Sequence, residues 1–509
     1  MEYNIYAGGE LAGEFSERAP HRGDLGEIDM SERNEGGLRA LRQHPLVARI
    51  NAWMTTPLYV MTIMLLAVIG YVCSVEIAVY TVYMFIGLYL SLLGEDYLPV
   101  MPMVFACYII PSAKNNPGMS EGSIFYPENG GVFILTIAAL FAISILARLC
   151  TDRELGGIRF LKSQRKLLPG LLAVGAAYLL AGTGSGHYFD KGLQNLLFGG
   201  IQFVALAFVY WFFAGAVRWE RVRTDYFVWM GFGYGLVILC EILHIYLTGN
   251  LVRPDGVIEI GKISSGWGNA NNIGAMIAMT VPFAFYLSCR EKHGWIYNFC
   301  ASMLLVGVVL TSSRTAILGA GFAYGCAFLM SVRRSRLDGN RGNLIAHALT
   351  VLAVIAVIVV FWDKLLRLFT IMIDKGFDSS RRDTLYVAGI KQWLKYPFFG
   401  GTFYPIDYRP EEWSEVAAFT AFFPPRWHNT LVQLAACCGT VGLAAYGWHR
   451  FQTIRLWWGR KDQSHVVCIG LSVLSLLLMS LLDCHMYNIG PALFYSMALA
   501  ILEKCPDTK

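Results

Sequence analysis

Long apolar runs recur along most of the chain and constrain its fold more than any other feature. A transmembrane helix needs about 20 mostly apolar residues, and fourteen runs approach or reach that length. The sequence therefore predicts an all-α polytopic integral membrane protein with about 12–14 transmembrane helices. The runs cover residues 55–75, 77–93, 97–112, 130–149, 167–183, 195–216, 226–248, 272–289, 295–311, 315–331, 344–362, 427–447, 465–483 and 488–503.

The composition agrees with a membrane location and excludes several other classes. Only 15% of the 509 residues are charged, whereas a soluble domain carries about 25%. The 41 Lys and Arg against 36 Asp and Glu give a net charge of +5, which is far from the basic surface of a nucleic-acid-binding domain. We therefore expect membrane lipids and no nucleic acid as partners.

The cysteines and acidic residues give no sign of a metal or cofactor site. The twelve cysteines are scattered, without a Cys-x-x-Cys pair or a His/Cys cluster at the spacing of metal ligands. No Asp-x-Asp motif occurs either. We expect no disulfide framework, no metal and no cofactor.

The distribution of positive charge predicts how the chain is threaded. Cytoplasmic connections carry an excess of Lys and Arg. With the N-terminus inside, five inner connections hold 18 Lys and Arg, whereas the short outer connections hold five. This asymmetry predicts a multi-pass protein of the cytoplasmic membrane with both termini in the cytoplasm. Residues 1–52 form the N-terminal tail, with an amphipathic helix expected over residues 38–53.

One outer connection is much longer than the others. Residues 363–426 form an extracytoplasmic loop, and loops of this length in compact proteins are usually functional. Helical spacing of its apolar residues predicts a helix over residues 378–396, lying on the outer face.

Three segments on the predicted outer side carry polar residues that membrane helices rarely need. They are TSSRTAILG at residues 311–319, SSRRDTLYVAGIKQWLKYPFFGGTF at residues 379–403, and PPRWHNTLVQLAACCGTVGLAAY at residues 424–446. Taken alone, each has an ordinary interpretation: Arg314 fits an interfacial arginine, the pair of Arg381 and Arg382 fits loop charge, and His428 fits a helix-capping residue.

In this order, and with the long loop between the first and the last, the three segments resemble the O-antigen ligase/polymerase superfamily of membrane glycosyltransferases. A fourth segment, GWGNANNIGAM at residues 266–276, resembles the family's Gly-aromatic-x-Asn-Pro-Asn motif, with Ala270 in place of the proline. The resemblance covers about residues 260–447 and implies a GT-C-like fold with a large outer loop. It divides the chain into the tail at residues 1–52, N-terminal transmembrane helices at 53–260, the ligase-like catalytic region at 261–447, and C-terminal helices with a short cytoplasmic tail at 448–509.

The resemblance also implies which residues act. The turn arginine of the family falls on Arg314, its loop arginine on Arg382, three residues before Leu385, and its histidine on His428. We expect these three to be catalytic. As substrate-binding residues we expect Arg381, Asn269, Asn271 and Asn429.

The chemistry that the resemblance implies suits these residue types. The donor is a glycan on undecaprenyl diphosphate, and the acceptor is a hydroxyl of a glycan or lipid. Two arginines stabilise the leaving diphosphate as permanent cations with planar donor forks, and a histidine takes the acceptor proton. Since no nucleophilic carboxylate is evident, direct displacement inverts the anomeric carbon without a metal.

Several alternatives stay open from the sequence. A transporter or flippase of lipid-linked sugars is the main rival, and it predicts inverted repeats or discontinuous helices with charges inside the membrane. Within the enzyme class, a ligase, a polymerase and a protein oligosaccharyltransferase share the same motifs. Glu241 and His244 are expected to form a structural pair on one helix face. Asp483 and His485 lie at the last outer turn and receive no role.

Overall fold

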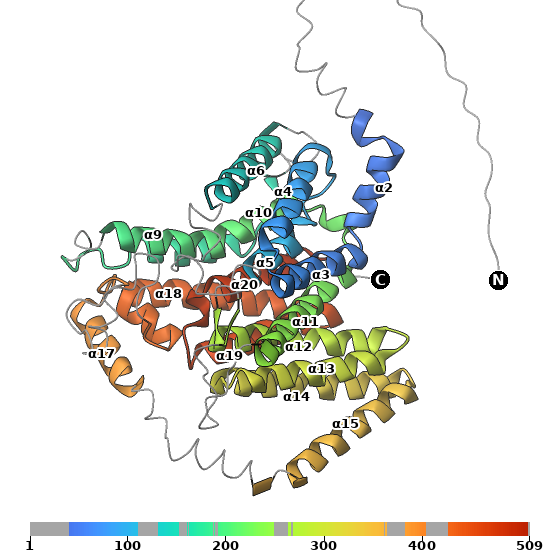
Figure 1. Ribbon diagram of the computed structural model, residues 1–509. Coiled ribbons are helices and arrows are strands. Elements are labelled where there is room, and N and C mark those ends of the chain that lie inside the picture. The colour runs from blue at the N-terminus through green and yellow to red at the C-terminus, as the bar shows by residue number, and fades with distance from the viewer. Residues whose placement is uncertain are drawn as a thin grey trace, which may run out of the picture.

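The computed structural model describes residues 40–109, 131–151, 160, 162–186, 188, 192–248, 263–265, 268–360, 362–363, 382–403 and 426–506. Helices dominate this part of the chain (Figure 1). Its first half contains α2 (Pro45–Met54), α3 (Pro57–Cys73), α4 (Glu76–Leu93), α5 (Val100–Ile109), α6 (Gly131–Thr151), α8 (Leu168–Leu179), α9 (Gly192–Phe203), the π-helical η3 (Val204–Phe208), α10 (Val209–Ala216), η4 (Trp219–Arg221) and α11 (Thr224–Thr248).

The second half opens with an antiparallel pair of two-residue strands, β1 (Ser264–Ser265) and β2 (Gly268–Asn269). It continues with α12 (Ala270–Arg290), α13 (Gly294–Leu310), α14 (Arg314–Leu337), α15 (Arg341–Val360), α17 (Arg382–Lys395), α18 (Thr430–Trp458), α19 (Ser464–Ser480), η9 (His485–Tyr487) and α20 (Ile489–Lys504).

The apolar runs of the sequence correspond to these helices. Each of the fourteen runs overlaps a helix or, for residues 195–216, the continuous α9, η3 and α10. Within the described residues, six helices are long and apolar enough to cross a membrane, or seven if the bent pair of α2 and α3 is one span. α14 and α18 extend past the apolar runs by several residues, because helical geometry continues into the charged segments that follow them. The prediction of 12–14 crossings remains a prediction.

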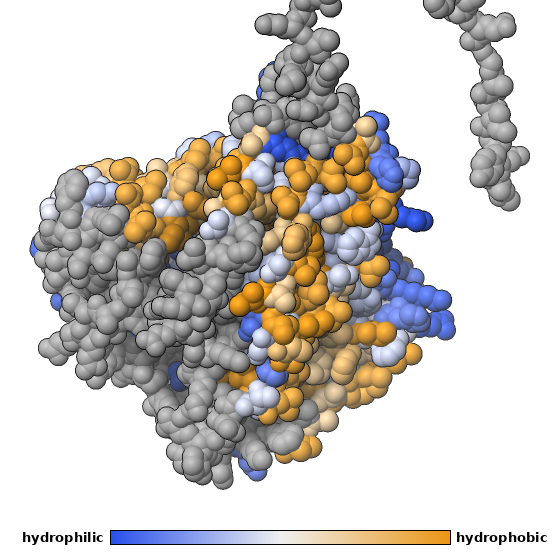
Figure 2. All heavy atoms as spheres, turned by 45° about the horizontal axis from the view of Figure 1, so that its top comes forward, coloured by the Kyte–Doolittle hydropathy of each residue, from blue (hydrophilic) through white to orange (hydrophobic). Residues whose placement is uncertain are grey.

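The outer surface of the helices is apolar, as contact with lipid requires. Large apolar side chains such as Phe85, Phe299, Leu329 and Leu352 are well exposed. Figure 2 shows apolar surface over much of the described molecule, with hydrophilic atoms gathered along the right-hand edge. Because such exposure is unfavourable in water, the chain is a multi-pass membrane protein.

Connections that the charge rule assigns to one side of the membrane contact one another in the structure. On the predicted inner side, Asp96 accepts a hydrogen bond from the Arg218 backbone N–H at 3.1 Å, and Arg290 donates to Ser464. On the predicted outer side, the Phe403 backbone N–H donates to the Asn195 side chain at 3.0 Å. These contacts agree with the threading predicted from charge.

α12 is the most enclosed helix of the domain that follows α11. It packs against α11, α13, α14 and α19 (Figure 1), and most of its residues are buried. Close approach to α14 depends on Gly274, where a Cβ atom would lie 2.6 Å from the Ala316 Cβ. Small residues have this role in membrane helix packing. The packing fixes the N-terminal ends of α12 and α14 at the same end of the bundle.

α18 is broken at Gly439, and the loop after α17 is bonded into the break. Gly439 has φ 65° and ψ −161°, a conformation essentially restricted to glycine. The backbone N–H of Thr440 donates to the Pro397 carbonyl at 2.7 Å, and the Gly401 N–H donates to the Ala436 carbonyl at 2.8 Å. Residues 397–401 thus satisfy the backbone groups that the break frees, as the membrane interior demands. This contact ties α17 to α18 (Figure 1).

Substituting Gly439→Ala is expected to destabilise the protein. The added Cβ would lie 2.3 Å from the Phe398 carbonyl oxygen, and the backbone conformation adds about 1–3 kcal/mol. Gly447→Ala on the same helix is the matched control, since a Cβ there meets no atom within 4 Å. The thermal midpoint of the detergent-solubilised protein should fall for the first variant only. Equal midpoints would contradict the role of the break.

Candidate active site

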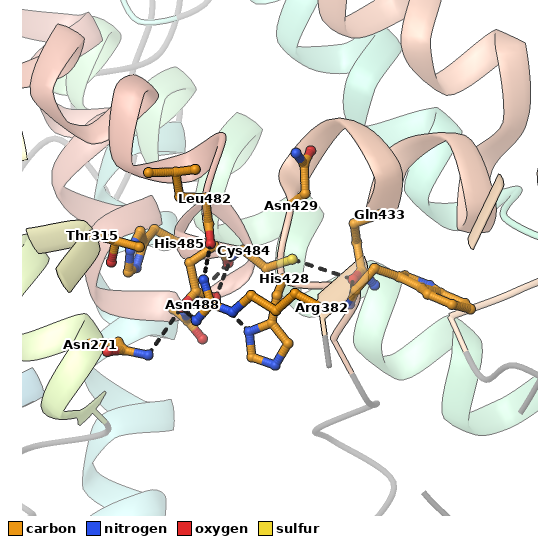
Figure 3. Close-up of polar contacts among 12 residues, drawn as sticks. Asn271, Thr315, Arg382, His428, Asn429, Gln433, Leu482, Cys484, His485 and Asn488 are labelled. Atoms are coloured by element: carbon orange, nitrogen blue, oxygen red, sulfur yellow. Dashed lines mark hydrogen bonds and ion pairs between the residues drawn. The ribbon is translucent and has the colours of Figure 1, made fainter. Parts of the chain in front are cut away.

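A buried carboxylate, Asp483, joins side chains from three distant helices. It follows α19 by three residues and is only 6% exposed. Its Oδ1 lies 3.1 Å from His428 Nδ1, and its Oδ2 accepts a hydrogen bond from Asn271 Nδ2 at 3.1 Å. Arg382 Nη2 lies 3.8 Å from the same Oδ2. Figure 3 shows the three side chains converging from α12, α17 and the start of α18.

The contacts around Asp483 keep its carboxyl ionised. Burial by itself raises the pKa of a carboxyl group. Here the hydrogen bond from His428, the positive potential of His485 and His428, and the Cys484 backbone N–H, at 2.7 Å from Oδ1, outweigh burial and lower the pKa of Asp483 below its usual range. The site therefore holds a permanent negative charge beside an arginine and a histidine.

Arg382 lies in the first turn of α17, and the three nitrogen atoms of its guanidinium differ in their contacts. Its Nη1 donates to the Leu482 carbonyl at 2.5 Å, while Nη2 faces Asp483. Its Nε is buried and has no hydrogen-bond partner among the described residues. Buried donors are nearly always bonded in folded proteins, so this N–H is available to a ligand.

His428 is oriented by its backbone and by its ring contact. Its φ of 51° lies in the left-handed region, and the Tyr386 hydroxyl donates to its carbonyl at 3.1 Å. An ionised carboxylate only accepts hydrogen bonds, so the contact with Asp483 puts the proton of the neutral ring on Nδ1. Nε2 then carries the lone pair, and with the side chain 37% exposed it can take a proton from a ligand.

A second layer of polar contacts joins α12 to the segment after α19. The Asn272 carbonyl oxygen Oδ1 accepts from Asn488 Nδ2 at 2.5 Å and lies 3.2 Å from His485 Nδ1. His485 and Asn488 are labelled in Figure 3. Burial lowers the pKa of His485, and the charge of Asp483 opposes this effect. This layer fixes the backbone on either side of Asp483.

The structure gives Asn429 a capping role. Its Oδ1 accepts from the backbone N–H groups of Leu431 and Val432, at 2.8 and 3.1 Å, and its Nδ2 donates to the Leu481 carbonyl at 2.8 Å. Asparagine is among the preferred N-cap residues. Asn429 therefore begins α18 and ties it to the end of α19. Asn271, by contrast, is directed at Asp483.

Arg314 begins α14 at the same end of the bundle. Ser313 caps this helix by accepting from the Ala316 N–H. The first turn of α14 packs on Gly274, which is one turn along α12 from Asn271. Arg314 itself is exposed. The structure does not bring it to Asp483 in the way that it brings Arg382.

Two of the expected site residues have side chains that lie outside the described part of the structure. Arg381 lies outside the described residues, and Asn269 is described only as a backbone position of β2. The predicted outer helix is present where the loop is described, as α17. The rest of residues 363–426 is outside the described part, except for residues 363, 382–403 and 426.

Two residues of the site were missed by the sequence reasoning. Asp483 was noticed without a role, although a carboxylate that ends an apolar run is costly in a membrane and therefore a signal of function. Arg426 was not singled out. Its guanidinium lies over the rings of Phe198 and Tyr487, at 5.0 and 5.8 Å, and donates to the Tyr487 carbonyl at 2.9 Å.

The remaining polar pair of the sequence analysis lies elsewhere. Glu241 is fully buried in α11. His244 packs edge-on against Tyr71 of α3, with ring centroids 5.6 Å apart. Both belong to the contact of α11 with α3, away from Asp483.

A comparison with known proteins matches part of the chain to a family. Residues 299–447 match the family described as O-antigen ligase. This region includes Arg314, Arg382 and His428, whereas Asn271 and Asp483 lie on either side of it. No curated protein matches the chain. Residues 299–447 are thus similar to the O-antigen ligase family, which supports the resemblance to the O-antigen ligase/polymerase superfamily.

Proposed function

We propose that this protein transfers a glycan from undecaprenyl diphosphate to an acceptor hydroxyl at the outer face of the cytoplasmic membrane. The observation that carries the proposal is the convergence of Arg382 and His428 on Asp483, which combines a cation for phosphate with a base. The family match supports the general class of reaction. In this proposal both termini lie in the cytoplasm and the site faces outward.

Arg382 and Arg314 stabilise the leaving diphosphate. Arg382 has a buried Nε–H with no partner among the described residues, and a guanidinium matches phosphate oxygens in geometry and charge. Arg314 stands at the N-terminus of α14, where the backbone N–H groups also favour an anion. Arg381 and Asn269 complete the proposed substrate contacts.

His428 is the base in this mechanism, and Asp483 positions it. The acceptor O–H gives its proton to His428 Nε2 while its oxygen forms a bond to C1 of the donor sugar. The bond from C1 to the diphosphate oxygen breaks, and the electron pair leaves with the diphosphate. This single displacement inverts C1 and needs no metal. Asp483 stabilises the imidazolium that forms, as a paired carboxylate does for catalytic histidines.

The acceptor separates three enzymes that share this chemistry. A polymerase extends a chain on the carrier lipid, a ligase moves the finished chain to a lipid or cell-wall acceptor, and a protein oligosaccharyltransferase moves it to protein hydroxyls. We favour a surface-polysaccharide ligase or polymerase, on the family match.

The rival function, a transporter of lipid-linked sugars, predicts inverted repeats or a discontinuous helix whose free ends bind substrate. α18 is discontinuous at Gly439. However, the backbone groups at this break are bonded to residues 397–401 of the same chain. The break therefore serves to hold α17, and the geometry favours the enzyme.

Replacing Arg382 by alanine tests whether its guanidinium binds the leaving diphosphate. A hydrogen bond between charged partners contributes about 1.5–3 kcal/mol, so kcat/KM should fall about 10- to 150-fold. The kcat/KM of Arg382→Lys should lie between those of the wild type and Arg382→Ala, because an ammonium group lacks the planar fork. The measurement is release of undecaprenyl diphosphate from a lipid-linked donor in proteoliposomes.

Lys391→Ala is the matched control, since Lys391 is an exposed cation on the same helix. It should leave the rate unchanged. If both alanine variants lose the same activity, or if Arg382→Ala is fully active, Arg382 does not contact the diphosphate.

A further inference from the structure

A groove lies between α12, α14 and α19, at their ends remote from Asp483. Its volume is about 400 Å³, which is in the range of small-molecule sites. Phe285, Met330 and Leu471 supply much of its apolar wall. Met330 is 43% exposed, so the wall is continuous with the lipid-facing surface.

Arginines stand around this apolar wall. Arg290, Arg333 and Arg334 line the groove, together with Asp338 and Asp462. Arg334 is paired with Asp338, with 2.7 Å between Nε and Oδ2. Arg290 and Arg333 remain as the cations that offer charge to a ligand.

Arg290 is fixed in place at the edge of the groove. Its guanidinium lies over the Tyr286 ring at 5.5 Å, and its Nη2 is 3.4 Å from the Ser464 hydroxyl. This contact links the end of α12 to the start of α19. The groove thus has a positioned cation at its edge, beside the apolar wall.

The groove lies about one membrane thickness from the candidate active site. Asn271 and Arg290 are 19 residues apart on α12, and at 1.5 Å per residue this is about 28 Å. The hydrocarbon core of a bilayer is about 30 Å thick. The groove is therefore at the headgroup level of the leaflet opposite the site, where basic pockets between helices bind anionic lipids.

We propose that this groove binds an anionic glycerophospholipid of that leaflet. The lipid phosphate lies between Arg290 and Arg333, and one acyl chain lies along Phe285, Met330 and Leu471. A zwitterionic lipid fills the apolar wall equally well but brings a cation to the two arginines. Charge complementarity therefore selects the anionic lipid.

Binding in the groove stabilises the arrangement of helices that carries the site. α19 is joined to α12 by the Ser472 hydroxyl, which donates to the Met279 carbonyl at 2.5 Å, and to α14 by Ser475, which donates to the Gly319 carbonyl at 3.2 Å. A lipid seated between the same three helices adds to these contacts. It binds the folded state only and so raises the thermal midpoint.

The test uses the purified full-length chain in a neutral detergent. Dioleoylphosphatidylglycerol is titrated while bound lipid is counted by native mass spectrometry and the thermal midpoint is recorded. We expect saturable binding of one lipid and a rising midpoint. Dioleoylphosphatidylcholine and glycerol phosphate should each bind at least tenfold more weakly. Equal binding of either one would overturn the proposal, because it would show that charge or the acyl chain does not matter.

The double variant Arg290→Gln/Arg333→Gln locates the lipid. Each arginine near a headgroup contributes about 1 kcal/mol. Removing both should therefore weaken lipid binding about thirtyfold. The control is Arg336→Gln/Arg341→Gln, which removes two exposed arginines of the same end that do not line the groove. Equal weakening in both would place the lipid elsewhere. The wild-type titration decides the proposal even if the double variant fails to fold.

Discussion

Glycan transfer is expected to slow by about 10²–10⁴-fold when His428 is replaced by alanine, because general-base catalysis contributes a factor of this size. The exposure of the His428 side chain and the contact of its Nδ1 with Asp483 are the features that support this expectation. The rate is measured with a lipid-linked donor in proteoliposomes. Donor binding should change little, since the arginines that we propose to hold the diphosphate remain.

The backbone at His428 requires a second variant. Its φ of 51° makes alanine strained there, whereas asparagine visits the left-handed region readily. His428→Asn should therefore fold as well as the wild type and be as inactive as His428→Ala. His293→Ala is the control, because His293 is an exposed histidine at the other end of the bundle. An active His428→Asn variant would remove His428 as the base.

The same variants in cells identify the acceptor. Loss of long chains with accumulation of single repeat units indicates a polymerase. Long chains retained on the carrier lipid indicate a ligase, and loss of glycan from protein alone indicates an oligosaccharyltransferase. An unchanged surface polysaccharide, with the variant correctly inserted in the membrane, would favour the transporter instead.

Replacing Asp483 by asparagine is expected to reduce kcat by about 10²-fold or more. Three side chains, His428, Arg382 and Asn271, share this carboxylate. The amide keeps the size of the group but loses its charge, so the imidazolium that forms in the reaction is no longer stabilised. Its NH₂ group also competes with donors that previously met an acceptor.

The wild type and the Asp483→Asn variant should also differ in stability over a defined range of pH. The pKa of Asp483 is lowered in the folded protein, so its charge stabilises the fold fully above the ordinary carboxyl pKa of about 3.9. This contribution is lost only when the pH falls through the lowered pKa. The difference in thermal midpoint between wild type and Asp483→Asn should therefore not become smaller as the pH falls from 8 to 5. A difference that disappears within this range would show that Asp483 is not held ionised by its partners.

Much of the architecture was predictable because the membrane imposes local rules. Each crossing needs a long apolar run with its backbone bonded internally, and such runs can be read without knowing their neighbours. The contact of Asp96 with Arg218 and that of Phe403 with Asn195 agree with the sides that the charge rule assigns. The motifs around Arg314, Arg382 and His428 indicated the family, which residues 299–447 match.

The sequence shows the glycine at which α18 breaks but does not indicate the break. In the sequence, Gly439 is one glycine of an apolar run, and, at a distance from this run, Gly400 and Gly401 follow Pro397. Their relation appears only in the tertiary structure, where residues 397–401 bond to the backbone on both sides of Gly439. A glycine in an apolar run has the same sequence signature whether it packs against a helix or breaks one.

The sequence by itself determined the helices, and its motifs indicated the resemblance that the match of residues 299–447 supports. Only the tertiary structure decided that Asp483 joins Asn271, Arg382 and His428, while Asn429 is used as a cap. The physical reason is that hydrophobic length and charge are properties of a segment. The meeting of four segments up to 212 residues apart depends on how whole helices pack, and a single chain sequence does not state this.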